Sequence, residues 1–219
     1  MTRTSHLTID LPDADATRAL GRALAAQLRA GDLVMLTGDL GAGKTTLTQG
    51  IGAGLDVRGQ VASPTFVIAR VHPPLGDGPA LVHVDAYRLG SLEEVDALDL
   101  DASLDESVTV VEWGRGLVES IARDRIELTL SRPRGADGAS QDALAAILED
   151  AESGTRRVTV EGFGERWSGL EVPGAVVVSD GDGAGLPGGA ASPAGPAPVP
   201  SGGASGAAAP PADRAESVG

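Results

Sequence analysis

The spacing of apolar residues changes its period along the first part of the chain. Alternation with polar residues over 7–11 predicts a strand with one buried face. A helical period follows over 16–28 and predicts a helix with Asp13 as its cap. The helical period returns over 47–55, after a glycine-rich stretch. These patterns predict that strands and helices alternate along the chain.

Three nearly continuous apolar runs predict strands that are buried on both faces, at 33–36, 81–84 and 108–111. Such strands are typical of parallel sheets with helices on each side. One more strand is expected near 67–71, and a last pair at 125–131 and 156–160. The pattern as a whole predicts an α/β fold, a three-layer sandwich with a mostly parallel sheet.

The remaining segments give shorter helices and loops. Ser91 and Glu94 resemble a capping box, which predicts a helix that continues through Leu100. A short amphipathic helix is expected over 141–152. The proline- and glycine-rich segments 73–79 and 133–140 predict surface loops.

The stretch between the first buried strand and the following helix fits the phosphate-binding pattern G-x-x-x-x-G-K-[ST]. In this pattern the backbone N–H groups of the loop turn inward around the phosphates of a nucleotide. Glycines permit the positive backbone torsions and the close approach that a side chain would block. We therefore expect a P-loop NTPase-like fold, with nucleotide bound by Gly38, Asp39, Leu40, Gly41, Ala42, Gly43, Lys44, Thr45 and Thr46.

The alternative to a phosphate loop is an ordinary turn in a glycine-rich protein, since 31 of the 219 residues are glycine. Lys44 argues against that alternative, because it is the only lysine in the chain and all other long basic residues are arginine. A compact ammonium group suits contact with the terminal phosphates. The Thr45 hydroxyl would ligate the magnesium ion that accompanies the nucleotide.

Composition and charge limit the kinds of partner. The formal net charge of -14 argues against direct nucleic-acid binding, which needs clustered basic residues, and favours a protein partner. Without cysteine the chain has no disulfide or thiolate metal site. The first ten residues lack a signal-peptide core, and no apolar run approaches the length of a membrane span. We expect a cytoplasmic protein that does not bind membranes.

Two of the predicted buried strands end in acids, Asp85 and Glu112. Ligands bind at the carboxyl ends of such strands, so both acids are candidates for holding magnesium or orienting the attacking oxygen. Either acid alone would also suit the capping of a turn. Thr65, in the segment Ser63-Pro64-Thr65, belongs either to a simple turn or to a switch that senses the terminal phosphate. His83 is expected to be a packed core residue.

Four segments occur together in an order that resembles the TsaE family of small bacterial ATPases: GDLGAGKTT (38–46), SPTF (63–66), HVDAYRL (83–89) and VEWG (111–114). The first segment alone indicates only a P-loop protein, whereas the set is specific. The resemblance covers about residues 7–167. A long link at 132–154 and the segment from Pro173 depart from the compact family pattern, and neither contains one of these motifs.

The resemblance implies a P-loop domain that binds ATP with Mg²⁺ and works with the TsaB and TsaD proteins in threonylcarbamoyl transfer to tRNA adenosine. It implies that Thr45 and Glu112 coordinate the metal and that Trp113 lies close to the nucleotide. It places Lys44 on the phosphates, Thr65 in the switch and Asp85 near the attacking water, as the catalytic set. The partners, rather than this protein, would carry the tRNA.

Three other functions share some of these features. A GTPase needs an Asn-Lys-x-Asp motif, and the only lysine already lies in the phosphate loop. A small-molecule kinase needs an acceptor pocket and an arginine-bearing lid, for which 123–134 is a weak candidate. A non-catalytic binding module would not need the pair Asp85 and Glu112. ATP hydrolysis is therefore favoured, with the kinase as the alternative.

The composition changes toward the C-terminal end. The segment 169–219 is dominated by Gly, Ala, Pro and Ser and has almost no apolar periodicity. Such a sequence cannot bury enough surface to offset its ordering entropy, so it is predicted to be a disordered tail. The P-loop ATPase domain is accordingly expected to span residues 1–168.

Overall fold

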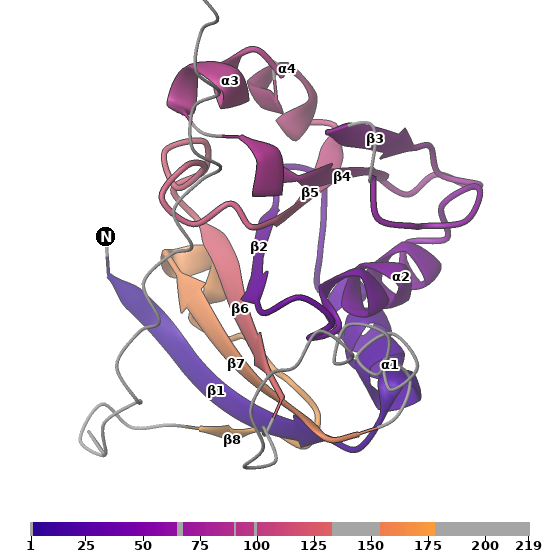
Figure 1. Cartoon of the computed structure of the whole chain (residues 1–219), viewed down its shortest axis with the longest axis vertical. Helices are drawn as coiled ribbons and strands as arrows, with labels where there is room; N and C mark the ends of the chain where they lie inside the picture. The colour runs from indigo at the N-terminus through magenta and orange to yellow at the C-terminus, as the bar shows by residue number, and fades with distance from the viewer. Residues whose placement is uncertain (1, 65–67, 90, 99, 133–153, 178–219) are drawn as a thin grey trace, which may run out of the picture. The chain divides into compact units, whose positions relative to one another are not determined.

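An eight-stranded mixed sheet forms the centre of the fold, in the order β3-β4-β5-β2-β6-β7-β1-β8 (Figure 1). The computed structural model describes residues 2–64, 68–89, 91–98, 100–132 and 154–177. The strands are β1 Arg3–Leu11, β2 Leu33–Gly38, β3 Ala69–His72, β4 Ala80–Asp85, β5 Ser107–Glu112, β6 Arg125–Ser131, β7 Arg156–Phe163 and β8 Val176–Val177. The four strands β4, β5, β2 and β6 are parallel, and the outer strands pair antiparallel.

The helices cover both faces of the sheet. They are α1 Ala14–Ala25, α2 Lys44–Gly54, α3 Leu92–Asp96 and α4 Leu100–Leu104, with short 3-10 turns η1 Ala86–Arg88 and η2 Glu165–Trp167. Alternate residues of β2 point to opposite faces, so that Val34 and Leu36 join one apolar cluster with α1 and α2. Leu33 and Met35 join a second cluster with α3, α4 and Val118. The predicted three-layer α/β sandwich is therefore confirmed.

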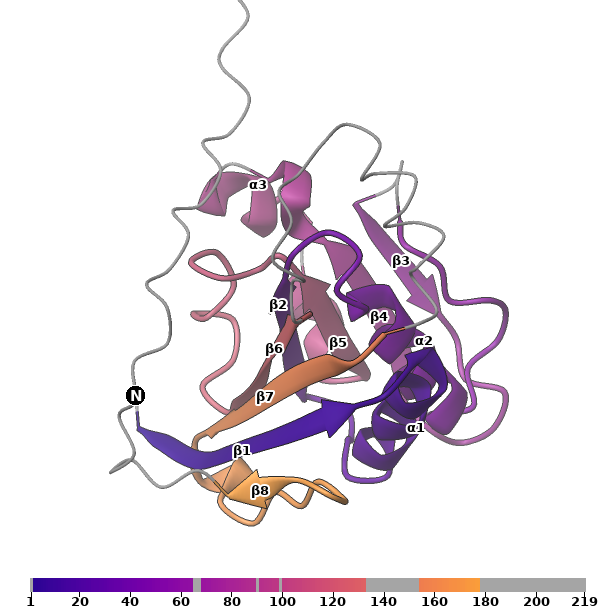
Figure 2. The ribbon, with the colours of Figure 1, turned by 60° about the horizontal axis from the view of Figure 1, so that its bottom comes forward.

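α1 and α2 lie side by side in both views (Figures 1 and 2) and meet at two glycines. A Cβ on Gly21 would lie 2.4 Å from the carbonyl oxygen of Leu47, and one on Gly50 would lie 2.3 Å from that of Arg18. These distances leave no room for a side chain, so the two backbones are in contact. This contact fixes the position of α2, whose first turn carries the predicted phosphate-binding residues.

Most predicted elements occur where the pattern placed them, with shifted ends. Asp13 caps α1 as expected and accepts a hydrogen bond from the Ala16 amide at 2.8 Å. Ser91 likewise caps α3, but the single helix predicted through Leu100 is two short helices, α3 and α4. The predicted helix 141–152 and loop 133–140 lie outside the described residues.

The domain boundary predicted at residue 168 is too early. Leu170 and Val172 are buried in the same cluster as α1, and Val176–Val177 forms β8, which pairs with Leu7 and Thr8 of β1. Leu170 and Val172 bury surface against the sheet and α1, which composition alone did not indicate. Residues 178–219, for which disorder is predicted, lie outside the described part. Among the described helices, none is long and apolar enough to cross a membrane.

Candidate nucleotide site

The loop between β2 and α2 has the backbone conformation that a phosphate loop requires. Gly38, Gly41 and Gly43 have φ angles of 148°, 75° and 105°, in a region that disfavours side chains. A Cβ on Gly38 would also lie 2.3 Å from the carbonyl oxygen of Leu130 on β6, and the loop is thus pressed against the sheet. The predicted glycine positions are therefore dictated by geometry as well as by motif.

The N-terminus of α2 opens into this loop. Gly43 is its N-cap residue, and no side chain in the described structure caps this end of the helix. Uncapped amide groups and the positive end of the helix dipole favour an anion at this position. α2 is eleven residues long and only residues 39–43 separate it from β2, so its first turn adjoins the loop. The arrangement suits a nucleotide phosphate.

Lys44 lies across the loop, with its side chain almost fully buried. Its Nζ donates to the carbonyl oxygens of Gly38 at 2.8 Å and Asp39 at 3.0 Å, and lies 4.1 Å from the centroid of the Trp113 ring. Burial lowers the pKa of Lys44, and the charges of Glu112, Asp85 and Asp39 partly oppose that shift. A phosphate bound in the loop would favour the charged form of this ammonium group.

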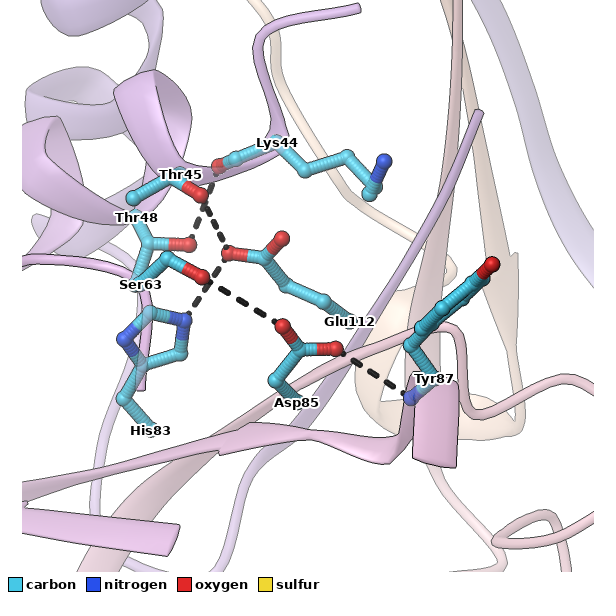
Figure 3. A network of polar contacts seen from close by, with 8 residues as sticks. All are labelled: Lys44, Thr45, Thr48, Ser63, His83, Asp85, Tyr87 and Glu112. Atoms are coloured by element: carbon cyan, nitrogen blue, oxygen red, sulfur yellow. Dashed lines mark hydrogen bonds and ion pairs between the residues drawn. The ribbon is translucent and has the colours of Figure 1, made fainter. Parts of the chain in front are cut away.

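Thr45 and Glu112 connect α2 to the end of β5 (Figure 3). The Thr45 hydroxyl donates to Glu112 Oε1 at 2.9 Å, and the Nε2 of His83 lies at the same distance from the same oxygen. Glu112 and His83 are both buried, at 3% and 0% exposure. One carboxylate oxygen therefore receives hydrogen bonds from two sides, from the helix and from β4.

Asp85 lies next to Glu112 at the end of the neighbouring parallel strand. The two residues pair directly in the β4–β5 register, so both carboxylates lie on the face that α2 covers. Asp85 caps η1, since its Oδ1 accepts from the Tyr87 amide at 3.2 Å, and its Oδ2 accepts from the Ser63 hydroxyl at 3.3 Å (Figure 3). The capping role and the position beside the loop thus occur together in one residue.

Trp113 follows β5 with an unusual backbone. Its φ angle is 63°, which is rare for a bulky residue, and its amide donates to the Leu36 carbonyl of β2 at 3.0 Å. The ring contacts Tyr87 edge-on, with 5.4 Å between centroids, as well as the Lys44 ammonium. The hydrogen bond to β2 and the two ring contacts together place the indole beside the loop.

The oxygen atoms around Thr45 suit a magnesium ion that is bound partly by the nucleotide. They suit less well a metal ion that is held by protein side chains alone. Within the described residues no group of three His, Cys, Asp or Glu side chains is arranged to hold a metal. Mg²⁺ typically takes one or two protein ligands and completes its shell with phosphates and water. The adjacent Thr45 Oγ1 and Glu112 Oε1 supply hard oxygen donors of that kind.

Sequence comparison matches the chain to one protein family. A sequence model of the family "Threonylcarbamoyl adenosine biosynthesis protein TsaE" matches residues 11–139. The chain belongs to the TsaE family. The tRNA threonylcarbamoyladenosine biosynthesis protein TsaE of Streptomyces coelicolor is 60% identical over 156 residues, which cover 71% of this chain and 96% of the relative. That of Mycobacterium tuberculosis is 48% identical over 137 residues, covering 59% and 82%.

A solved structure supports the same fold. The crystal structure of Bacillus subtilis YdiB superposes with a TM-score of 0.52 at 27% sequence identity, over 76% of this chain and 91% of the other. The match confirms the predicted P-loop α/β architecture for this member of the TsaE family.

The structure brings most of the predicted site residues together. Lys44, Thr45, Asp85, Glu112 and Trp113 all lie around the loop. Within the loop, the Leu40 side chain is 68% exposed, so only its backbone is placed to contact a phosphate. Thr65, the predicted switch residue of the TsaE family pattern, lies outside the described residues.

Two contributors were not assigned a role from the sequence. His83 is a buried core residue, as expected, but it also bonds to Glu112. Arg156, on β7, is fully buried beside the loop, and a Cβ on Gly43 would lie 3.1 Å from its Nε. The sequence could have indicated a role for His83, because side chains alternate along a strand and His83 and Asp85 therefore lie on the same face. For Arg156 the sequence carried no comparable signal.

Proposed function

We propose that this protein is a magnesium-dependent ATPase that supports threonylcarbamoyl transfer to tRNA adenosine, together with TsaB and TsaD. Family membership supports the role in tRNA threonylcarbamoyladenosine biosynthesis. The observation that carries the ATPase proposal is the Thr45–Glu112 hydrogen bond directly beside the phosphate loop. It brings a strand-end carboxylate to the first turn of a helix whose amides face an anion site, as phosphoryl transfer requires.

Each residue of the site has a role in this proposal. The loop amides and Lys44 would bind the phosphates, and Thr45 and Glu112 would hold Mg²⁺. The ion would neutralise charge on the phosphates when bound. Asp85, paired with Glu112 in the register, would orient the attacking water and accept its proton. Trp113 would contact the nucleotide beside Lys44.

The charge of the chain supports a division of labour with the partners. A formal net charge of -14 disfavours direct contact with the tRNA backbone. TsaB and TsaD would therefore carry the tRNA, and this protein would contribute ATP turnover. Positioning dominates phosphoryl transfer, so turnover by the isolated protein would be slow and docking of the partners would raise it.

The test measures phosphate release from ATP by the full chain, alone and with TsaB and TsaD, with Mg²⁺ present or chelated. We expect slow release alone, a clear increase with partners and loss on chelation. Lys44→Met, which keeps most of the length of the side chain without its charge, is the control for contaminating activity. ATP consumption that yields a phosphorylated small molecule instead of inorganic phosphate would identify a kinase.

A cellular measurement tests the link to tRNA. Deletion of the gene should lower threonylcarbamoyladenosine in digested tRNA nucleosides measured by mass spectrometry. Thr65→Ala should reduce stimulation by the partners more than nucleotide binding, if Thr65 acts as a switch. An unchanged nucleoside level in a strain without a second copy of the gene would contradict the proposed function.

A further inference from the structure

His83 is placed to control the orientation of Glu112. It lies within β4 at 0% exposure, two residues before Asp85 on the same face of the strand. Its Nε2 lies 2.9 Å from Glu112 Oε1 (Figure 3). The same oxygen accepts the Thr45 hydroxyl at 2.9 Å. The histidine and the threonine therefore both hold the same carboxylate oxygen.

The hydrogen bonds fix the protonation pattern of the imidazole. Glu112 Oε1 is an acceptor, so His83 Nε2 must carry the proton. Nδ1 is buried and has no hydrogen-bond partner in the described part of the structure. A proton on Nδ1 would leave a buried donor unpaired, which costs free energy. The ring tautomer with hydrogen on Nε2 satisfies both conditions, and among the described residues the ring's one polar contact is with Glu112.

A buried carboxylate needs this kind of support. A glutamate side chain has three rotatable bonds, and a carboxylate at 3% exposure requires hydrogen-bond partners, because an unpaired buried polar group costs free energy. Thr45 supplies one donor, but its hydroxyl is also the group expected to turn a lone pair toward the metal. His83 comes from β4, which pairs with β3 on one side and β5 on the other, and it has no such second task.

We propose that His83 is a positioning residue, which holds the Glu112 carboxylate beside Thr45 in the orientation that binds the magnesium ion of the nucleotide. This inference rests on the proposed function, because it assumes a metal-nucleotide site at the loop. It assigns to His83 no contact with substrate. Loss of its Nε2–H should weaken metal binding, as loss of an outer-shell hydrogen bond to a ligand typically does by about 10- to 100-fold.

The test compares three variants of the full chain. In His83→Gln the amide nitrogen lies at the position of Nε2 and retains the donor, whereas in His83→Asn the amide is one bond shorter and does not reach Glu112. His83→Leu removes the polar group. Binding of Mn²⁺ in the presence of ADP, measured by electron paramagnetic resonance, reports the metal site without turnover. Thermal unfolding is measured alongside to identify loss of fold.

We expect the Asn and Leu variants to bind Mn²⁺ about 10- to 100-fold more weakly than the parent, and the Gln variant within a few-fold of it. Equal affinity of the parent and the Asn variant would overturn the inference, even if the Leu variant did not fold. Equal weakening in the Gln and Asn variants would also overturn it. If the parent itself fails to bind Mn²⁺ with ADP, the proposed function fails and the inference fails with it.

Discussion

The Thr45 hydroxyl donates to Glu112 Oε1 across 2.9 Å and so joins the first turn of α2 to the end of β5. The two residues are far apart in sequence, and each belongs to a different part of the predicted site. The bond links the helix turn that follows the loop directly to a strand-end carboxylate. Changes on either side of it should therefore affect metal and nucleotide binding together.

Lys44→Met should abolish nucleotide binding without lowering stability. Burial lowers the pKa of Lys44 below 10.5, so the folded chain holds this proton less tightly than the unfolded chain. The buried charge therefore lowers the free energy of unfolding. This destabilisation is fully present at pH values below the lowered pKa and disappears as pH rises toward 10.5. We expect the variant to unfold at or above the parent temperature at neutral pH, and to lose fluorescent ATP-analogue binding.

The same variant gives a test of the sign of this shift. The free energy of unfolding of the variant minus that of the parent should fall as pH rises from neutral toward 10.5. Urea unfolding at a series of pH values measures the difference. A difference that grows with pH would show that the Lys44 pKa is not lowered.

Glu112→Gln and Asp85→Asn should have separable effects. Glu112→Gln removes a charge from the expected metal ligand, and should weaken Mn²⁺ binding by more than about tenfold. Asp85→Asn should leave metal binding nearly intact and reduce turnover by about 10²- to 10⁴-fold, as loss of a general base does. Asp77→Asn, in an exposed loop, is the control and should match the parent. Equal losses of metal binding in both variants would contradict the assigned roles.

Gly50→Ala should destabilise the protein. The added Cβ would lie 2.3 Å from the Arg18 carbonyl oxygen, so α1 and α2 must separate. Overpacking of this kind costs about 1–3 kcal/mol, which opposes the gain of about 1 kcal/mol that alanine gives in a helix. We expect a lower urea midpoint and weaker nucleotide binding. Gly76→Ala, with no atom within 4 Å of its Cβ, should leave both unchanged.

Two truncations test the corrected domain boundary. A chain ending at Val177 should keep the parent stability, because the composition of residues 178–219 predicts no core. A chain ending at Ser168 loses buried Leu170 and Val172 and all of β8. Its free energy of unfolding should fall by about 3 kcal/mol, from the transfer value of buried aliphatic side chains. Equal urea midpoints for the two truncations would instead support a domain boundary at residue 168.

The sequence predicted the position and backbone conformation of the loop between β2 and α2 well, because each residue type in it has a narrow physical use. Glycine at 43 permits a φ of 105°, and lysine at 44 supplies a compact cation. The central strands were equally predictable, since few other structures bury long runs of valine and leucine. Asp85 and Glu112 followed from these strands, because the carboxyl ends of parallel strands meet at one edge.

Contacts that depend on register could not be predicted in the same way. His83 reaches Glu112 only because Asp85 pairs with Glu112 across β4 and β5, and a shift of two residues would separate them. Leu170 and Val172 were missed because their burial depends on the apolar cluster that they join with α1 and β1. Both cases require knowledge of neighbours that are distant in sequence.

The central position of β2 has a consequence for how the protein folds. β2 pairs with β5 and with β6, both of which come much later in the chain. The loop that follows β2 therefore has no fixed support until these long-range pairings form, a topology associated with slow folding. Nucleotide binding would then report completion of the whole central sheet, and a bound nucleotide would stabilise only the finished fold by mass action.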